Sequence, residues 1–170
     1  PMQVAKNTAQ IAAGKAITPH FLKSIDGKPV EFAPTELFTP KEKAQLPLVR
    51  RGMYEVGNNP DGGTAYKLIH TAVVPLAVKT GTAQVVGISQ TAKKRMKEAD
   101  MDYFHRSHAW MTSFGPYDKP QYAVTVLVEH GGGGGSAAGP VIMQIYEKLA
   151  QMGYIDANAT TSKDSAKKTK

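Results

Sequence analysis

Apolar positions in the first forty residues predict one helix and one hairpin. Apolar side chains recur at roughly helical spacing over residues 2–12, and Gly14 is placed to end that helix. Because the helical pattern is already under way at the first residue, we expect the chain to begin inside a larger domain. Two apolar stretches, residues 20–25 and 29–32, flank Asp26-Gly27-Lys28, which predicts a hairpin with an Asp-Gly turn.

The next segment carries a strong helix-start signal. Residues 39–42 read Thr-Pro-Lys-Glu, which supplies an N-cap hydroxyl, a proline at the first helical position and an acid at the third. We expect a helix from there to about residue 57, with a possible break at Pro47. A further short helix is expected over residues 64–69.

The second half of the chain alternates between apolar strands and polar connections. Strands are predicted at residues 73–86, 108–114 and 122–128, and the last is the clearest in the chain. The tight turn between the last two strands favours antiparallel pairing. A helix is expected over residues 137–152, with Ser136 as its N-cap and Gly153 at its end. We therefore predict an α+β fold, an antiparallel sheet flanked by helices.

Composition narrows the class of protein. The chain has 170 residues, of which 41% are hydrophobic and 21% are charged, which is enough for a real core. It contains no cysteine, so disulfides, thiolate metal sites and a cysteine nucleophile are excluded. No apolar run approaches the roughly 18 residues of a membrane span. We expect residues 1–155 to belong to one domain.

The net charge of +7 does not point to nucleic acid. Much of it lies at residues 91–106 and in the final segment 156–170, which has no aromatic side chain. Nucleic-acid surfaces combine basic and aromatic groups on one face. We therefore interpret the charge as solvated and residues 156–170 as a disordered basic tail.

Two motifs suggest other chemistry. Residues 133–138 match the G-x-G-x-x-A dinucleotide fingerprint, but no apolar strand follows the predicted helix to complete a βαβ unit. Asp100, Asp102, His105 and His108 are close in sequence, yet their spacing fits no helix face well, which favours a solvated loop over a metal site. We expect neither a cofactor nor a metal.

Lys79-Thr80-Gly81 is the most informative short motif. It lies within a predicted strand, so Lys79 and Gly81 should point to one face and Thr80 and Thr82 to the other. A glycine lets an extended ligand lie against the strand, and lysine and threonine side chains can hold a carboxylate. The alternative is an exposed strand with a surface lysine and a bulge glycine.

A longer set of strings resembles class B penicillin-binding proteins, and among them the penicillin-binding protein 2 group of cell elongation. The strings are residues 79–85, 108–110, 123–130, 134–138, 1–9 and 59–65. The family's site combines Ser-x-x-Lys, Ser-x-Asn and Lys-Thr-Gly. This chain has no Ser-x-Asn, and its one Ser-x-x-Lys, at Ser165, lies in the predicted tail. The resemblance thus implies the C-terminal portion of a penicillin-binding, β-lactamase-like transpeptidase domain, without its nucleophile.

The resemblance also implies a reaction and roles for four residues. The full-length protein would be a serine-type D-Ala-D-Ala transpeptidase that cross-links peptidoglycan stem peptides, and this chain alone would be inactive. Lys79 would hold the substrate carboxylate and orient the Ser-x-Asn hydroxyl. Gly81 would admit the substrate backbone. The hydroxyls of Thr80 and Thr82 are candidates for the carboxylate, with Thr82 favoured, and the Thr82 backbone N–H would serve the oxyanion hole.

Partners and location follow from the same resemblance. They would be stem peptides, β-lactam antibiotics, the N-terminal remainder of the protein, and elongation proteins such as the MreC scaffold and a SEDS-type glycosyltransferase. The site would face the periplasm at the inner membrane, with an upstream anchor. One alternative of a different class stays open: a non-catalytic module of the same fold that binds peptides or senses β-lactams. An upstream Ser-x-x-Lys would distinguish the enzyme from that module.

Overall fold

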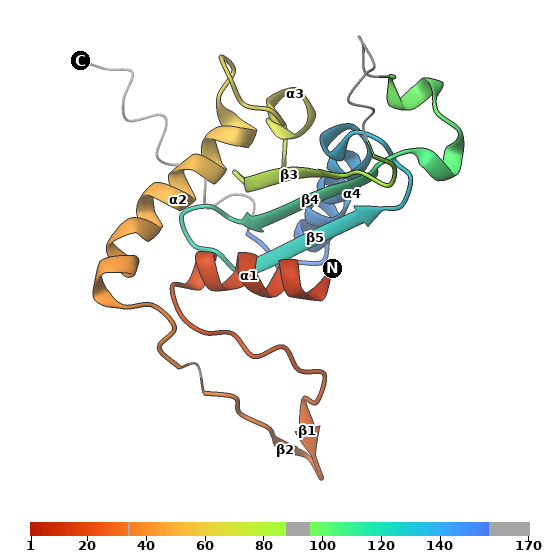
Figure 1. The fold of residues 1–170 in the computed structure, drawn as a ribbon. Helices are drawn as coiled ribbons and strands as arrows, with labels where there is room; N and C mark the ends of the chain where they lie inside the picture. Colours follow the sequence, from red (N-terminus) through yellow and green to blue (C-terminus); the bar gives the residue numbers. More distant parts are fainter. Residues whose placement is uncertain (34, 88–95, 157–170) are drawn as a thin grey trace, which may run out of the picture.

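A computed structural model describes residues 1–33, 35–87 and 96–156. A three-stranded antiparallel sheet lies at its centre, in the order β3-β4-β5 (Figure 1). The strands are β3 (Ala77–Ala83), β4 (His108–Gly115) and β5 (Tyr122–Val128). The predicted α+β class and antiparallel sheet are confirmed. None of the described helices has the length and apolar character that crossing a membrane requires.

The first helix and the hairpin agree with the sequence pattern. Helix α1 (Met2–Ala13) ends at Gly14, whose φ of 70° is left-handed. Strands β1 (Ser24–Ile25) and β2 (Lys28–Pro29) form the predicted hairpin, with positive φ at both turn residues, 47° and 78°. This two-residue turn matches the mirror-image geometry that Asp-Gly favours. The strands are shorter than expected, and the hairpin projects away from the sheet (Figure 1).

Helix α2 (Pro40–Asn58) begins as predicted and continues past Pro47 without a break. The Thr39 hydroxyl accepts from the Glu42 N–H, and the Glu42 carboxylate accepts from the Thr39 N–H, which completes a capping box. The Thr39 N–H and the Thr39 hydroxyl each donate to the Glu42 carboxylate at 2.8 Å, and both hydrogen bonds lower the pKa of the Glu42 carboxyl because they favour its charged form. Helix α3 (Tyr66–Ile69) follows after a glycine-rich loop.

Helix α4 (Gly134–Gln151) begins earlier than the sequence suggested. Its N-cap is Gly133, so the prediction that Ser136 caps this helix is wrong. Ser136 lies inside the first turn, where its hydroxyl donates to the Gly133 carbonyl oxygen at 3.0 Å. An early start is possible because the glycines let the backbone enter the helix against the sheet.

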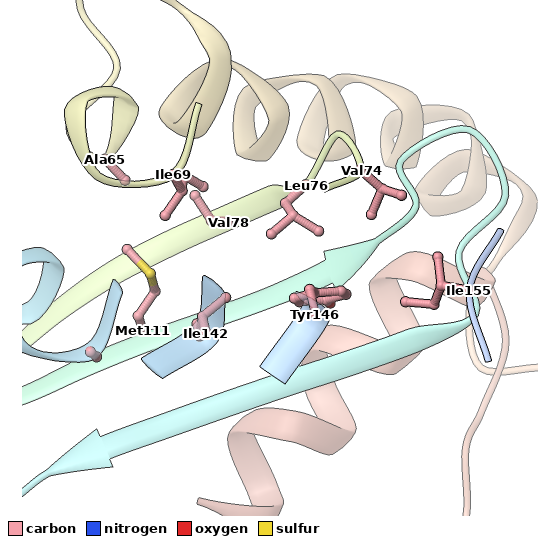
Figure 2. Packing of buried hydrophobic residues seen from close by; sticks show 10 residues of the cluster. Ala65, Ile69, Val74, Leu76, Val78, Met111, Ile142, Tyr146 and Ile155 are labelled. Carbon is pink, nitrogen blue, oxygen red and sulfur yellow. The ribbon is translucent and has the colours of Figure 1, made fainter. Parts of the chain in front are cut away.

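The core lies on the face of the sheet that α3 and α4 cover (Figure 2). Its fully buried members come from both helices, the sheet and the segment before β3, and include Ile69, Leu76, Val78, Met111, Ile142 and Tyr146. The Tyr146 hydroxyl donates to the Tyr122 carbonyl oxygen at 3.2 Å and also contacts the Ser113 hydroxyl at 3.3 Å. Burial raises the pKa of Tyr146 to about 12, and the hydrogen bond from Ser113 opposes part of that shift.

A smaller cluster covers the opposite face. It joins Ala12 of α1, Met53 of α2, and the paired strand residues Ala77 and Phe114. Helix α2 therefore lies beside the start of β3, where Asn58 also donates to the Leu76 carbonyl oxygen at 2.8 Å. The first two residues of β3 are buried and the remaining five are half-buried or exposed.

Strand β3 is shorter than the predicted strand over residues 73–86. The apolar side chains of residues 73–76 pack into or against the core. Their backbone pairs with no strand among the described residues. Pairing ends at Ala83 because its partner, His108, is the first residue of β4. The proposed boundary of the domain at residue 155 and the basic tail remain predictions, since residues 157–170 lie outside the described part.

Candidate active site

The Lys-Thr-Gly motif lies in the exposed half of edge strand β3. On its inner side β3 pairs with β4, in a register that sets Lys79 opposite Thr112, Thr80 opposite Met111 and Gly81 opposite Trp110. No strand among the described residues pairs with its outer side. Alternate backbone N–H and C=O groups of such an edge face outward and can accept an extended peptide. The strand therefore has the geometry that β-augmentation requires.

Lys79 is exposed, and its side chain is held close to the strand. The Nζ atom donates to the carbonyl oxygen of Thr80 at 2.7 Å. An ammonium group carries three donors, so two remain for other acceptors. A ligand carboxylate near this edge would find a positive charge already positioned.

Gly81 faces Trp110 across the β3–β4 pair. A Cβ atom at this position would lie 3.2 Å from the Trp110 Cβ, which is tighter than ordinary contact. Glycine thus lets the tryptophan pack closely while leaving its own side of the strand open for a ligand backbone. The predicted alternation is consistent with the packing, because Lys79, Gly81 and their partners lie on the face away from α4.

The two threonines lie on the α4 side of the sheet. The Thr82 hydroxyl accepts a hydrogen bond from the Gly134 N–H at 3.2 Å, although Thr82 itself is exposed. Thr80 is half-buried, and its methyl group would be 3.5 Å from a Cβ at Gly135. The sequence expectation favoured Thr82 over Thr80 for contact with a ligand, and contact of either hydroxyl with a ligand stays a prediction.

On the same face of the sheet as Lys79, a chain of hydroxyl groups joins α1 to β4 and β5. Thr112, the cross-strand partner of Lys79, is 2.7 Å from the hydroxyl of Thr8 and 2.7 Å from that of Thr125. Thr8 is 3% exposed, so these groups satisfy one another instead of water. The sequence pattern did not predict this cluster of threonines. The available signal was Thr8, a polar residue in the middle of an apolar helix pattern.

The segment that precedes β4 is tied to the loop that precedes α4. Both carboxylate oxygens of Glu98 accept from Ser107, at 2.8 Å from its backbone N–H and 2.8 Å from its hydroxyl. The Ser107 carbonyl oxygen accepts from the Gly132 N–H at 2.8 Å. These hydrogen bonds join residues 98–107 to the loop before α4, and the next residue, His108, pairs with Ala83 at the end of β3.

The acidic and histidine residues of this segment do not gather into a metal site. His105 Nδ1 and Asp102 Oδ2 are 3.9 Å apart, and both side chains are exposed. The Nδ1 atom of His108 accepts a hydrogen bond from the His130 backbone N–H at 2.9 Å, so this lone pair is already used. Across residues 1–33, 35–87 and 96–156, no three His, Cys, Asp or Glu side chains are close enough to hold an ion.

The glycine run 131–135 serves packing. The described sheet is antiparallel throughout, so it does not contain the parallel βαβ unit that dinucleotide binding needs. Instead, the first turn of α4 rests directly on β3, and a Cβ at Gly134 would lie only 2.0 Å from the Gly81 carbonyl oxygen. Position 134 requires glycine because the backbones of α4 and β3 approach each other so closely there.

This arrangement of an antiparallel sheet, a C-terminal helix and Lys-Thr-Gly on the free edge defines a class of serine acyl-transfer domains. A sequence profile described as the penicillin binding protein transpeptidase domain matches residues 1–147. The chain belongs to this family.

Individual members of this family are similar to the chain in sequence and in structure. The chain is 37% identical over 153 residues to the peptidoglycan D,D-transpeptidase MrdA of Haemophilus influenzae, covering 86% of this chain and 23% of that protein. A complex between penicillin-binding protein PBP2 and MreC from Helicobacter pylori is similar in structure, with a TM-score of 0.75, 44% identity, and coverage of 91% of this chain and 25% of that one.

A third relative is PBP2 of Pseudomonas aeruginosa in complex with WCK 5153. Its TM-score is 0.68 at 35% identity, with coverage of 85% of this chain and 28% of that one. The chain thus spans about a quarter of the length of the relatives it matches.

Proposed function

We propose that this chain forms the C-terminal part of the transpeptidase domain of a peptidoglycan D,D-transpeptidase that acts in cell elongation. The observation that carries the proposal is Lys79-Thr80-Gly81 on the exposed, unpaired edge of β3 within the described residues. The match to the transpeptidase family and to relatives named D,D-transpeptidase supports it. The catalytic serine lies in a segment of the full-length protein outside this chain.

The proposed reaction is acyl transfer in two steps. The serine hydroxyl attacks the carbonyl carbon of the penultimate D-Ala of a stem peptide, its proton passes to a neighbouring base, and the terminal D-Ala leaves with a proton on its amine. The acyl-enzyme is then attacked by the amine of a second stem peptide, which releases the serine and forms the cross-link. β-Lactams acylate the same serine.

In this reaction the edge of β3 forms one wall of the cleft. Lys79 keeps the wall electropositive and attracts the terminal carboxylate of the donor peptide. The hydroxyl of Thr82 donates to that carboxylate, and Thr80 chiefly packs beneath the strand. Gly81 lets the peptide backbone approach. The Thr82 N–H, with the N–H of the absent serine, binds the oxyanion; loss of one such donor typically raises a barrier by about 2.7–4 kcal/mol.

The proposal extends to partners and place. Because a Helicobacter pylori relative has been seen in complex with MreC, we propose that the full-length protein binds an equivalent scaffold and acts with a SEDS-type glycosyltransferase. Its substrates are peptidoglycan stem peptides, and its inhibitors are β-lactams. The domain then works at the periplasmic face of the inner membrane, held by an anchor outside this chain.

The test is turnover of a stem peptide that ends in D-Ala-D-Ala, supplied with an acceptor amine. The full-length protein should release D-Ala and form the cross-linked product, and the isolated chain should do neither. A full-length protein that binds the peptide or a β-lactam without releasing D-Ala would contradict the proposal and favour the non-catalytic sensing module.

A further inference from the structure

The first turn of α4 touches the motif strand backbone to backbone. A Cβ atom at Gly134 would lie 2.0 Å from the Gly81 carbonyl oxygen and 2.7 Å from that of Trp110. Both distances are far below any real contact, so no side chain fits at this position. In Figure 1 this end of α4 lies beside the sheet at the end of β3. The start of the helix is therefore placed by the strand that carries Lys-Thr-Gly.

This approach gives one specific hydrogen bond. The Gly134 N–H donates to the Thr82 hydroxyl oxygen at 3.2 Å. Gly134 is the first residue of α4, and the N–H groups of a helix's first turn have no partner within the helix. They also carry the partial positive charge of the helix N-terminus. Thr82 thus supplies a partner for a donor that the helix leaves unpaired.

The hydrogen bond has a direction, which fixes what the hydroxyl can do next. A threonine hydroxyl has one hydrogen and two acceptor lone pairs. When one lone pair accepts from Gly134, the O–H hydrogen stays available for another acceptor, and Thr82 is exposed to solvent. The hydroxyl therefore keeps its hydrogen for a ligand, and an anionic ligand requires such a donor.

We propose that Gly134 is a positioning residue for substrate recognition: its N–H holds the Thr82 hydroxyl oriented to donate to the carboxylate of the acyl donor. This inference rests on the proposed function. The hydroxyl rotor is then ordered before substrate binds, so less conformational entropy is lost on binding. Gly134 contacts no substrate and acts only through Thr82.

Removing the N–H without adding atoms is the cleanest perturbation. Gly134→Ala would push a methyl group into the Gly81 carbonyl and so change packing and hydrogen bonding together. Replacing the Gly134 amide with an ester, by incorporating glycolic acid at that position of the full-length enzyme, deletes the donor and adds no side chain. It also makes the Gly133 carbonyl a weaker acceptor for the Ala137 N–H and the Ser136 hydroxyl. The same amide-to-ester replacement at Gly135, one residue further along the turn, is the matched control.

The readout separates positioning from structure. Second-order acylation rates are measured with benzylpenicillin and with its methyl ester, which lacks the carboxylate charge. The ester backbone at Gly134 should slow acylation by benzylpenicillin by about five- to tenfold, as expected for the loss of one hydrogen bond between neutral groups. It should leave the rate with the methyl ester within about twofold, and the Gly135 replacement should leave both rates near wild type.

A double-mutant cycle with Thr82→Val completes the test. In that variant the Gly134 N–H has no hydroxyl to hold, so the backbone ester should cause no further loss. Additive losses, equal slowing with both penicillins, or an unchanged rate with benzylpenicillin would overturn the inference.

The outcome also separates this inference from the proposed function. If Thr82→Val slows benzylpenicillin and the backbone ester does not, only the role of Gly134 fails. If neither Thr82→Val nor Lys79→Ala changes the rate, the placement of the motif in the active site fails as well.

Discussion

Truncation of Lys79 tests whether the motif strand recognises substrate. In the full-length enzyme, Lys79→Ala should slow acylation by benzylpenicillin strongly and leave the fold almost unchanged. The side chain is exposed, and its Nζ atom donates to the neighbouring Thr80 carbonyl oxygen. Exposed groups of this kind change the free energy of unfolding by no more than about 0.5 kcal/mol when removed. The stability of the variant should therefore match wild type closely.

The expected kinetic effect is larger because, in the proposed site, the substrate carboxylate binds beside the Lys79 ammonium. Two unit charges 4 Å apart attract by about 1 kcal/mol in bulk water and about 4 kcal/mol near a protein surface of lower effective dielectric. Desolvation offsets part of this gain, and hydrogen bonds to charged groups contribute roughly 1.5–3 kcal/mol net. At about 1.4 kcal/mol per factor of ten, the second-order acylation rate should fall by about ten- to a hundredfold.

The assay compares Lys79→Ala with Lys28→Ala, a control at an exposed lysine of the projecting hairpin. Acylation rates and melting temperatures are measured for both variants and for wild type. Lys28→Ala should match wild type in both. An unchanged acylation rate for Lys79→Ala, or a loss fully explained by a lower melting temperature, would refute the reasoning.

Two further predictions concern the core and are read from thermal unfolding of the full-length protein. Gly57→Ala should lower stability by about 1–3 kcal/mol, because its Cβ would lie 2.5 Å from Ile69 Cδ1, whereas Gly52→Ala, with no atom within 4 Å, should not destabilise; equal effects would contradict this packing. Tyr146→Phe should cost about 1 kcal/mol near neutral pH. Since burial raises the Tyr146 pKa from 10.0 to about 12, wild type should lose more stability than the variant as pH rises between those values, and an equal loss in both would refute this assignment.

Local signals were sufficient to predict most elements of the fold. The capping box at Thr39, the Asp-Gly turn and the apolar strand over residues 122–128 depend on neighbours in sequence, and each formed as predicted. The strand over residues 73–86 was predicted too long, because apolar content reports burial and not pairing. Ser136 was wrongly assigned as a cap, because the start of α4 is set by contact with β3.

The candidate site could be predicted only in part. The alternation of Lys79 and Gly81 with Thr80 and Thr82 follows from strand periodicity alone. The contact between Thr82 and Gly134 joins residues 52 positions apart, and no local pattern encodes it. The roles of these residues in catalysis remain proposals.

Peptide mapping of the acylated enzyme tests the central claim most directly. The full-length protein and the isolated chain are each incubated with a fluorescent penicillin, digested and analysed by mass spectrometry. We expect a covalent label on a serine outside residues 1–170 in the full-length protein, and no label on the isolated chain. A label on any serine within residues 1–170, or none on the full-length protein, would contradict the claim that this chain supplies the Lys-Thr-Gly wall of a serine transpeptidase.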